Sequence, residues 1–349
     1  MCHAQNKVIV LITIKDISKA SGFSVTTVSK ALNDYPDISQ TTKDRIIELC
    51  DKMGYVPNSS ARSLKTTHSF TIGVVFEEVT NQGLQHPVFS RILESFKRQM
   101  EEEGFDLLFL AKRMGNQNGS YLQHSKRKQV EAILVLCADF NTPELEELYE
   151  SDIPVIMIDF DVDNATSITS DNRKGVKQAV DHLIELGHEK IAHIYGDKDS
   201  FIGGQRKEYF EKSLKQSNIE LKDEYLADGL NFSREEGYVA MKKLLELPDP
   251  PTAVFCASDM LAIGALEAAS DKGIRVPQDI SIVGFDGIDL GQLITPRLTT
   301  IKQDTEEMGR LAAVSMLGHI KKPKRAKQGK TVTVSTQLIE GDSTTTPKS

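Results

Sequence analysis

The chain has 349 residues and a net charge of −8, so its length exceeds one hydrophobic core and two or three domains are expected. The charge is uneven: residues 1–70 carry nine Lys/Arg against six Asp/Glu, whereas the rest carries 33 against 44. A basic head of net charge +3 therefore precedes an acidic body of net charge −11, so the acidic average does not exclude nucleic acid.

Cysteine spacing and hydropathy exclude several classes of protein. Cys2, Cys50, Cys137 and Cys256 form no CxxC pair and no cluster, so we expect reduced thiols, mostly buried, and no zinc site. The apolar run at 8–12 is too short to cross a membrane and lacks a cleavage site. We expect a soluble cytoplasmic protein with no metal, no cofactor and no membrane partner.

Two short helices open the basic head. A capping box that starts at Thr13 and a stop at Gly22 predict a helix of barely two turns, with Ile17 and Ala20 on one face. Ser24 then caps a second helix, VTTVSKALN. The three-residue interval between them is typical of the turn of a helix-turn-helix.

The second helix has an outward face without carboxylates. Val28, Ala31 and Leu32 can pack inward, and the residues predicted to point outward are Val25, Thr26, Ser29 and Lys30. Short side chains on such a face suit a DNA groove, and Lys30 can reach a phosphate or a guanine edge.

A third helix is predicted from Ser39 or Thr41 to Gly54. Its buried face consists of Ile46, Leu49, Cys50 and Met53. Three helices of this size make one small core that is marginal by itself. A three-helix bundle with a solvated Thr/Ser face is the alternative interpretation.

Residues 58–69 read NSSARSLKTTHS and contain one bulky apolar side chain, Leu64. Asn58 can cap a helix of about two turns, but a helix this short is unstable alone in water. Either a partner holds the segment and gives Leu64 a place to pack, or the segment is a disordered linker with an incidental leucine.

The body alternates strand and helix patterns over about 230 residues. Apolar runs rich in β-branched residues predict strands at Thr71–Phe76, Asp106–Leu110, Ala132–Cys137, Val155–Ile158, Lys190–Tyr195, Ala253–Ala257 and Ser281–Phe285. Helices are predicted between them at Phe89–Glu103, Lys174–Leu186, Tyr209–Gln216, Glu235–Leu247 and Met260–Lys272. This order predicts an α/β fold with two doubly wound parallel sheets covered by helices on both faces.

The body contains no recognisable catalytic signature. GxGxxG, GxxxxGK[ST] and GxSxG are absent. His188, Glu189 and His193 come close to HExxH, but one residue too many separates the histidines. No nucleophile is paired with the carboxylates of the body, which are Glu77, Glu78, Asp159, Asp161 and Asp163. The sequence therefore predicts a protein that is not an enzyme.

Polar residues follow the ends of the predicted strands. Asp159, Ser258, Asp259 and Asp286 each end a strand, and Arg206 opens the helix after Gly203-Gly204. Doubly wound sheets bind ligands outside the carboxyl ends of their strands. Carboxylates and a guanidinium bind vicinal hydroxyls in a bidentate manner, so a polyhydroxylated ligand is expected.

Several blocks of the sequence resemble the LacI/GalR (lactose-repressor) family of bacterial transcription regulators. They are TIKDISKASGFSVTTVSKALN, TKDRIIELCDKMGYVPNSSARSLKT, TIGVVF, SDNRKGVKQAVDHLIELGHEKIAHI, PPTAVFCASDMLAIGALEAASDKGIRVPQDISIVGFDGIDL and LTTIKQDTEEMGRLAAVSML, and they cover the chain from about Thr13 to Leu338. The resemblance implies a helix-turn-helix head at 13–57, a hinge helix and linker at 58–69, and a two-lobed periplasmic-binding-protein-like effector domain at 70–340.

In this family the chain crosses between the lobes three times. The resemblance places the crossings near Thr169–Lys174, Leu298–Asp304 and the basic run at 321–327. The N-lobe then comprises about 70–170 and 304–328, and the C-lobe about 171–300 and 330–340. The basic run resembles a nucleic-acid patch, but we interpret it as a solvated connector because it lies far along the chain from the head.

The resemblance also implies a homodimer, or a higher oligomer, on near-palindromic double-stranded operator DNA. Carried over by motif, the DNA contacts are Thr13, Val25, Thr26, Thr27, Ser29, Lys30, Asn33, Tyr55, Asn58, Ala61, Arg62, Leu64 and Lys65. In the family the hinge leucine wedges between base pairs in the minor groove. Arg206 and Asp286 match motif positions that contact the effector in the family. Asp159, Ser258 and Asp259 match such positions less directly, and Val88 and Phe89 match them by position alone.

One departure from the family limits what can be carried over. The family has an Asn-Pro-aromatic-aromatic segment after its first strand, whereas this longer loop reads His86-Pro87-Val88-Phe89. We expect a transcription regulator, a repressor, controlled by a small polar effector such as a sugar or sugar derivative. The alternative is a sugar-binding or enzymatic α/β protein whose head only dimerises. The sequence leaves open whether the effector releases or promotes DNA binding.

Overall fold

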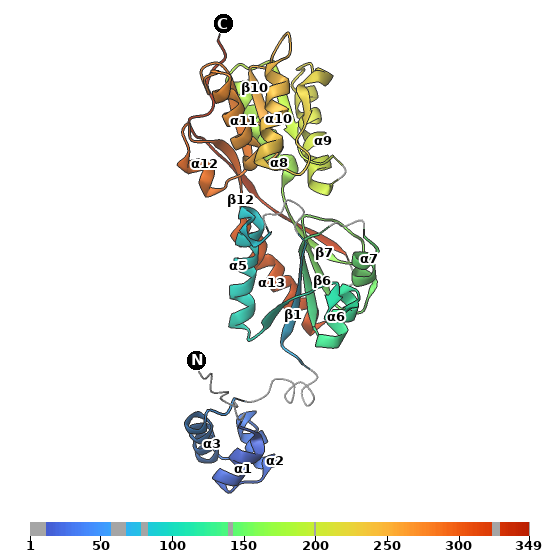
Figure 1. The fold of residues 1–349 in the computed structure, drawn as a ribbon, viewed down its shortest axis with the longest axis vertical. Coiled ribbons are helices and arrows are strands. Elements are labelled where there is room, and N and C mark those ends of the chain that lie inside the picture. The colour runs from blue at the N-terminus through green and yellow to red at the C-terminus, as the bar shows by residue number, and fades with distance from the viewer. Residues whose placement is uncertain are drawn as a thin grey trace, which may run out of the picture. The chain divides into compact units, whose positions relative to one another are not determined.

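The computed structural model describes residues 12–56, 68–77, 83–138, 142–198, 200–322 and 329–348. The chain divides into two compact units, residues 1–69 and 70–349 (Figure 1). In the described part of the chain, no helix combines the length and apolarity that crossing a membrane requires.

The first unit is a three-helix head whose helices are α1 (Ile14–Ser21), α2 (Val25–Leu32) and α3 (Gln40–Met53). The predicted caps are confirmed: Thr13 donates from its N–H and its hydroxyl to Asp16 at 2.9 and 2.7 Å, and Gly22 ends α1 at φ 77°. The core consists of Ile17, Val28, Ala31, Ile46 and Cys50. Ile17 is fully buried, whereas Ala20, predicted on the same face, is exposed.

The second unit contains two lobes, each built on a six-stranded sheet. The N-lobe sheet is wholly parallel in the order β13-β7-β6-β5-β1-β2. Its strands are β1 (Thr71–Phe76), β2 (Asp106–Phe109), β5 (Ala132–Cys137), β6 (Val155–Ile158), β7 (Thr166–Ser170) and β13 (Lys330–Val334). A short hairpin of β3 (Arg113–Met114) and β4 (Gln117–Asn118) and the 3-10 turn η1 (Gly83–Gln85) lie outside it.

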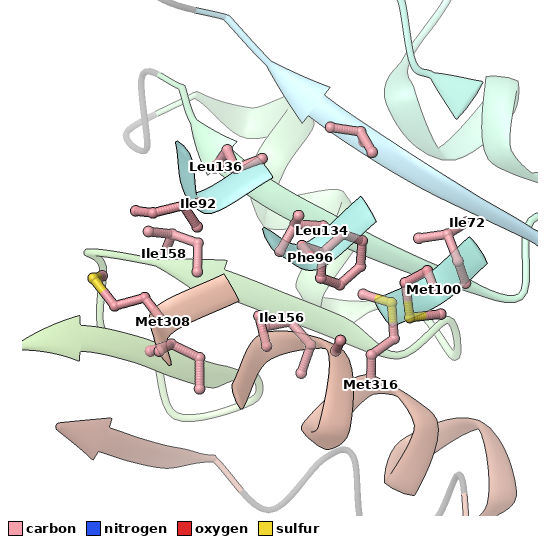
Figure 2. Packing of buried hydrophobic residues seen from close by; sticks show 14 of the residues in the cluster. Ile72, Ile92, Phe96, Met100, Leu134, Leu136, Ile156, Ile158, Met308 and Met316 are labelled. Carbon is pink, nitrogen blue, oxygen red and sulfur yellow. The ribbon is translucent and has the colours of Figure 1, made fainter. Parts of the chain in front are cut away.

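Helices cover both faces of the N-lobe sheet. On one face, α5 (Pro87–Glu102) and α13 (Thr305–Lys321) lie side by side; α6 (Tyr121–Lys128) and α7 (Pro143–Glu150) cover the other (Figure 1). Figure 2 shows the first core, in which Phe96 of α5 and Met316 of α13 meet Leu134 and Ile156 of the sheet. Gly309 allows the two helices to touch, because a Cβ there would lie 2.4 Å from the Ile92 carbonyl oxygen.

The C-lobe sheet has the order β14-β12-β11-β10-β8-β9 and is parallel except for β14, which runs antiparallel to β12. Its strands are β8 (Ile191–Tyr195), β9 (Leu226–Asp228), β10 (Ala253–Cys256), β11 (Ser281–Asp286), β12 (Thr299–Gln303) and β14 (Thr336–Ile339). The helical elements are α8 (Asn172–Glu185), α9 (Phe201–Gln216), η2 (Asp223–Tyr225), α10 (Arg234–Leu245), α11 (Asp259–Asp271) and α12 (Asp289–Leu293). One core lies under α10 and α11, the other under α8 and α9.

The predicted fold is confirmed, with differences at particular elements. All seven predicted strands form, and their ends agree within one residue. Helix α9 begins at Phe201 rather than Tyr209, because Ser200 caps it by accepting a hydrogen bond from Gly203 N–H. The elements without a prediction are β3, β4, β7, β9, β12, β13, β14, α6, α7, α12, α13 and the 3-10 turns η1 and η2.

The third crossing between the lobes differs from its predicted place. The first two join β7 to α8 and β12 to α13, as expected. The third is Ser335, between β13 of the N-lobe sheet and β14 of the C-lobe sheet, and not the basic run at 321–327. One residue separates these two strands, so in the sequence they look like a single one. The C-lobe also includes the tail, where Ser343 donates to the Ile282 carbonyl at 2.6 Å.

Candidate functional site

Three of the predicted DNA contacts, Val25, Thr26 and Thr27, form the first turn of α2. Ser24 accepts a hydrogen bond from Thr27 N–H at 3.1 Å, which fixes the first turn. Val25 and Thr26 are exposed, and Val28 on the opposite side is fully buried in the head core. The helix contains no carboxylate, so this turn can approach a phosphate backbone without charge repulsion.

Other predicted DNA contacts already have partners in the head. Lys30 forms a salt bridge with Asp37, and Asn33 donates to the Ser29 carbonyl at 2.7 Å. The Lys30 and Asp37 side chains are 36% and 51% exposed, so solvent screens their pairing and a phosphate can replace Asp37. Tyr55 is half-buried against the head core. The other predicted contacts lie outside the described residues: Asn58, Ala61, Arg62, Leu64 and Lys65.

In the second unit, Arg206 of α9 is the centre of a buried polar cluster. Its side chain is 4% exposed and stacks on Phe285, with the guanidinium carbon 3.7 Å from the ring centroid. Its Nε donates to Asn172 Oδ1 at 3.0 Å, and one Nη donates to the Ala257 carbonyl at 2.5 Å. The same Nη lies 3.6 Å from Asp286 Oδ1. Arg206 therefore joins α8, β10 and the end of β11.

Asp286 connects this arginine to the two crossing strands. Its Oδ1 accepts a hydrogen bond from Gln303 Nε2 at 2.7 Å, and Gln303 Oε1 accepts one from Ser170 at 2.6 Å. Ser170 ends β7 in the N-lobe and Gln303 ends β12 in the C-lobe. Asp286, Gln303 and Ser170 thus form a chain of hydrogen bonds that crosses from the C-lobe to the N-lobe.

Asp159 brings the N-lobe to the same cluster. It follows β6, has a left-handed backbone at φ 55°, and accepts a hydrogen bond from Thr169 at 2.9 Å. The charges of Asp159 and Arg206 interact across the lobes. The ring of Phe160 also meets that of Phe201 edge-on, with centroids 5.9 Å apart. The predicted residues Asp159, Arg206 and Asp286 therefore converge.

Burial perturbs the ionisation of the whole cluster. It raises the pKa of Asp286 to about 6, although Arg206 and the Gln303 amide favour the charged carboxylate. It also raises the pKa of Asp159, against the attraction of Arg206, and lowers the pKa of Arg206 itself. Several buried carboxylates therefore share one guanidinium, and a ligand that donates hydrogen bonds would favour their charged forms.

Ser258 and Asp259 hold the site together rather than line it. Ser258 caps α11 by accepting from Leu261 N–H at 3.2 Å. Asp259 is fully buried, and its two oxygens accept hydrogen bonds from the Thr300 hydroxyl at 2.5 Å and Ile288 N–H at 2.8 Å. Because Asp259 is fully buried, it does not fit its predicted role as an effector contact.

The predicted aromatic segment places one of its two residues near the lobe boundary. Val88 is 5% exposed and packs into the N-lobe core, so it does not fit the predicted role of an effector contact either. Phe89 is half-buried and meets Phe76 edge-on at 6.2 Å and His86 at 4.5 Å. Phe89 and Phe76 offer an apolar ring surface, which Val88 supports from behind.

Sequence reasoning missed four polar residues of the cluster. Asn172 and Gln303 bond directly to Arg206 and Asp286, and Thr169 and Ser170 support Asp159 and Gln303. All four lie at the first two predicted crossings. The crossings could have indicated them, because chain segments that join two lobes must pass the lobe boundary. Within the described residues, no group of three or more His, Cys, Asp or Glu is arranged to hold a metal ion.

Comparison with known proteins gives consistent matches along the chain. Residues 13–58 match the model of bacterial regulatory proteins of the lacI family, and residues 180–344 match a periplasmic binding protein-like domain. A probable HTH-type transcriptional repressor, ExuR, from Bacillus subtilis is 38% identical over 90% of this chain and 93% of its own. The repressor PurR of Mannheimia succiniciproducens is 34% identical over 86% and 89%.

Solved structures show the same architecture. The Lac repressor dimer bound to operator and the anti-inducer ONPF has a TM-score of 0.82 and 24% identity, covering 96% of this chain and 99% of its own, which shows the fold. The regulator CelR in complex with cellobiose has a TM-score of 0.69 and 26% identity over 95% and 99%. With repressors above 30% identity along most of its length, the chain belongs to the LacI family of DNA-binding bacterial transcription regulators.

Proposed function

We propose that this regulator represses transcription in the cytoplasm by binding a near-palindromic operator as a dimer, with each α2 in a major groove. A small polar effector, a sugar or sugar derivative, binds at Asp159, Arg206 and Asp286. The supporting relatives are repressors, and two related solved structures contain sugars: cellobiose in CelR, and ribose in a regulator from Enterococcus faecium with 27% identity and a TM-score of 0.67.

The convergence of Asp159 and Arg206 from different lobes carries the effector proposal. A carboxylate from one lobe and a guanidinium from the other, whose charges interact, can accept from and donate to the same set of hydroxyls. The half-buried rings of Phe160 and Phe201 meet beside them and offer an apolar surface to a sugar ring. A binding site shared by two lobes makes effector affinity depend on the angle between the lobes.

Hydrogen bonds connect this site to two of the three crossings. Arg206 bonds to Asn172, directly after the first crossing, and Asp286 bonds to Gln303, directly before the second. An effector that moves either charged group therefore changes the hydrogen bonds that hold the crossings. The expected consequence is a shift between two lobe angles, which the dimer transmits to the spacing of its DNA-binding heads.

The hinge segment completes the proposed mechanism. For residues 58–69, of which 58–67 lie outside the described part of the chain, the family resemblance implies a hinge helix that folds when two copies meet in the minor groove, with Leu64 as the wedge between base pairs. Arg62 and Lys65 then lie close to phosphates. Since a helix this short is unstable alone, its formation depends on the spacing that the lobes impose.

Operator binding measured against an effector panel tests the proposal. Operator-like palindromes are selected from a random duplex pool with the full-length chain, and their affinity is measured with and without sugars, sugar acids, sugar phosphates and nucleobases. We expect selective binding at physiological salt and a change of at least tenfold with one panel member. Affinity no better than for a mixed-sequence duplex at the same salt would overturn the proposal.

A further inference from the structure

Arg91 and Asp289 form an ion pair that joins the two lobes outside the charge cluster. Arg91 lies in the second turn of α5 in the N-lobe, and Asp289 begins α12 in the C-lobe. Figure 1 shows both helices at the boundary between the lobes. Arg91 donates a hydrogen bond to the Asp289 carboxylate and holds the pKa of that carboxyl below its usual range. Because the two side chains are 37% and 82% exposed, the pair by itself is a weak contact.

The residue before Asp289 adds an apolar contact at the same boundary. Ile288 belongs to the C-lobe, yet it is 3% exposed and is part of the N-lobe core that lies under α5 and α13. Met260 and Ile263 of α11, also in the C-lobe, are partly buried against this core. The removal of apolar surface from water holds the lobes together, and the ion pair selects which residues meet.

A tightly fitted segment connects these contacts to the charge cluster, because residues 286–289 are consecutive and begin with Asp286. Gly287 has a φ of 71°, and a Cβ there would lie 2.7 Å from a Cα of β12, so a larger residue does not fit. Ile288 N–H donates to Asp259 Oδ2 at 2.8 Å, and that carboxylate is fully buried. The segment therefore has little freedom to move independently of Asp286.

We propose that Arg91, Asp289 and Ile288 are positioning residues of the effector site. They fix the lobe angle at which the carboxylate of the N-lobe meets the guanidinium and the carboxylate of the C-lobe. The strands that cross between the lobes permit rotation, and contacts between helices away from the crossings limit how far the lobes rotate. The inference rests on the proposed effector site and names the residues that hold its two halves in register.

The distance between the lobes tests this proposal without DNA and without effector. Spin labels attached to p-acetylphenylalanine take the place of Glu147 in α7 and Lys215 in α9, which are exposed helix positions in the N-lobe and the C-lobe. Double electron–electron resonance on the full-length chain gives the distribution of distances between the labels. Dilution with unlabelled chain ensures that each label pair lies within one molecule.

Four variants separate the ion pair from the apolar contact. They are Arg91→Glu, Asp289→Arg, the charge swap that combines both substitutions, and Ile288→Ala. The matched control is Lys97→Glu, a charge reversal on the same helix at a position whose ion pair with Glu101 stays within α5. Equal thermal unfolding of the charge variants and the control shows that the substitutions leave the fold intact.

Each single charge reversal should raise the fraction of molecules outside the main distance by about two- to fivefold, because an exposed pair is weak. The charge swap should restore the parent distribution, since it forms the pair again in the opposite orientation. Ile288→Ala should broaden the distribution equally at low salt and at about 1 M salt, whereas salt should reduce the effect of the reversals. The control should match the parent.

Equal distributions in the parent, both reversals and Ile288→Ala would overturn the proposal. Broadening that the charge swap leaves unchanged would also overturn it, because the two charges would then not act as a pair. Neither operator nor effector enters the measurement, so failure to find an operator leaves these outcomes unaffected.

Discussion

Asp286→Asn removes one carboxylate from the charge cluster and keeps the size of the side chain. The Gln303 amide, which donates to Asp286 Oδ1 at 2.7 Å, retains an acceptor in the amide oxygen of asparagine. The substitution therefore changes the charge of the site with little change in its packing. Asp286→Asn can therefore change effector binding while the protein stays folded.

The pH dependence of stability follows from the raised pKa of Asp286. The folded protein holds the proton up to about pH 6, whereas an unfolded aspartate loses it near 3.8. Because the folded state binds the proton more tightly, stability falls as the pH rises through this window and stays lower above it. A difference of about 2 pKa units corresponds to about 3 kcal/mol, of which roughly half develops between pH 5 and pH 8.

Urea unfolding, followed by circular dichroism at pH 5 and pH 8, measures this effect. Between pH 5 and pH 8, we expect the free energy of unfolding of Asp286→Asn to rise by about 1 kcal/mol or more relative to that of the wild type. We also expect the variant to lose its response to effector. Asp163→Asn, at an exposed loop position, serves as the control and should follow the wild type. Parallel pH profiles for the wild type and Asp286→Asn would refute the reasoning.

Three further substitutions test the head, the helix packing and the hinge. Ile46→Ala, at a fully buried position, should cost about 2–5 kcal/mol and abolish DNA binding, with the calorimetric transition of the larger unit unchanged. Gly264→Ala places a methyl 1.9 Å from the Arg234 carbonyl oxygen, so α10 and α11 must separate; an unchanged melting temperature would contradict this close approach. Leu64→Ala should weaken operator binding and leave effector affinity intact, and equal operator affinity would make Leu64 a spacer.

The strands that sequence reasoning found and missed differ in composition for a physical reason. β5 and β10, AILVLC and AVFC, are buried on both faces by apolar side chains, so hydrophobic runs reveal them. β7, TSITS, is equally buried, but its hydroxyls bond to partners such as Asp159 and His319. The burial of a polar strand depends on hydrogen-bond partners that are distant in sequence, so no local pattern predicts such a strand.

The candidate site was predictable where a local rule applied. Asp159 follows one apolar strand and Asp286 ends another, and such positions converge at the carboxyl edges of parallel sheets. Gln303 and Ser170 are 133 residues apart, and only the crossing of two strands between the lobes brings them together. The sequence of β13 and β14 likewise cannot show which sheet each strand joins, because Ser335 alone separates them.

Asp286 destabilises the folded protein when the site is empty, and effector binding can reverse part of that destabilisation. This residue combines a backbone φ of 126° with a buried carboxylate whose pKa is raised to about 6, and both features disfavour the folded state at neutral pH. A ligand that donates hydroxyl hydrogen bonds to the carboxylate lowers that pKa and recovers part of the cost. The recovered free energy depends on the lobe angle at which donors reach both Asp286 and Asp159. A site that is destabilised when empty therefore favours one lobe angle when an effector binds.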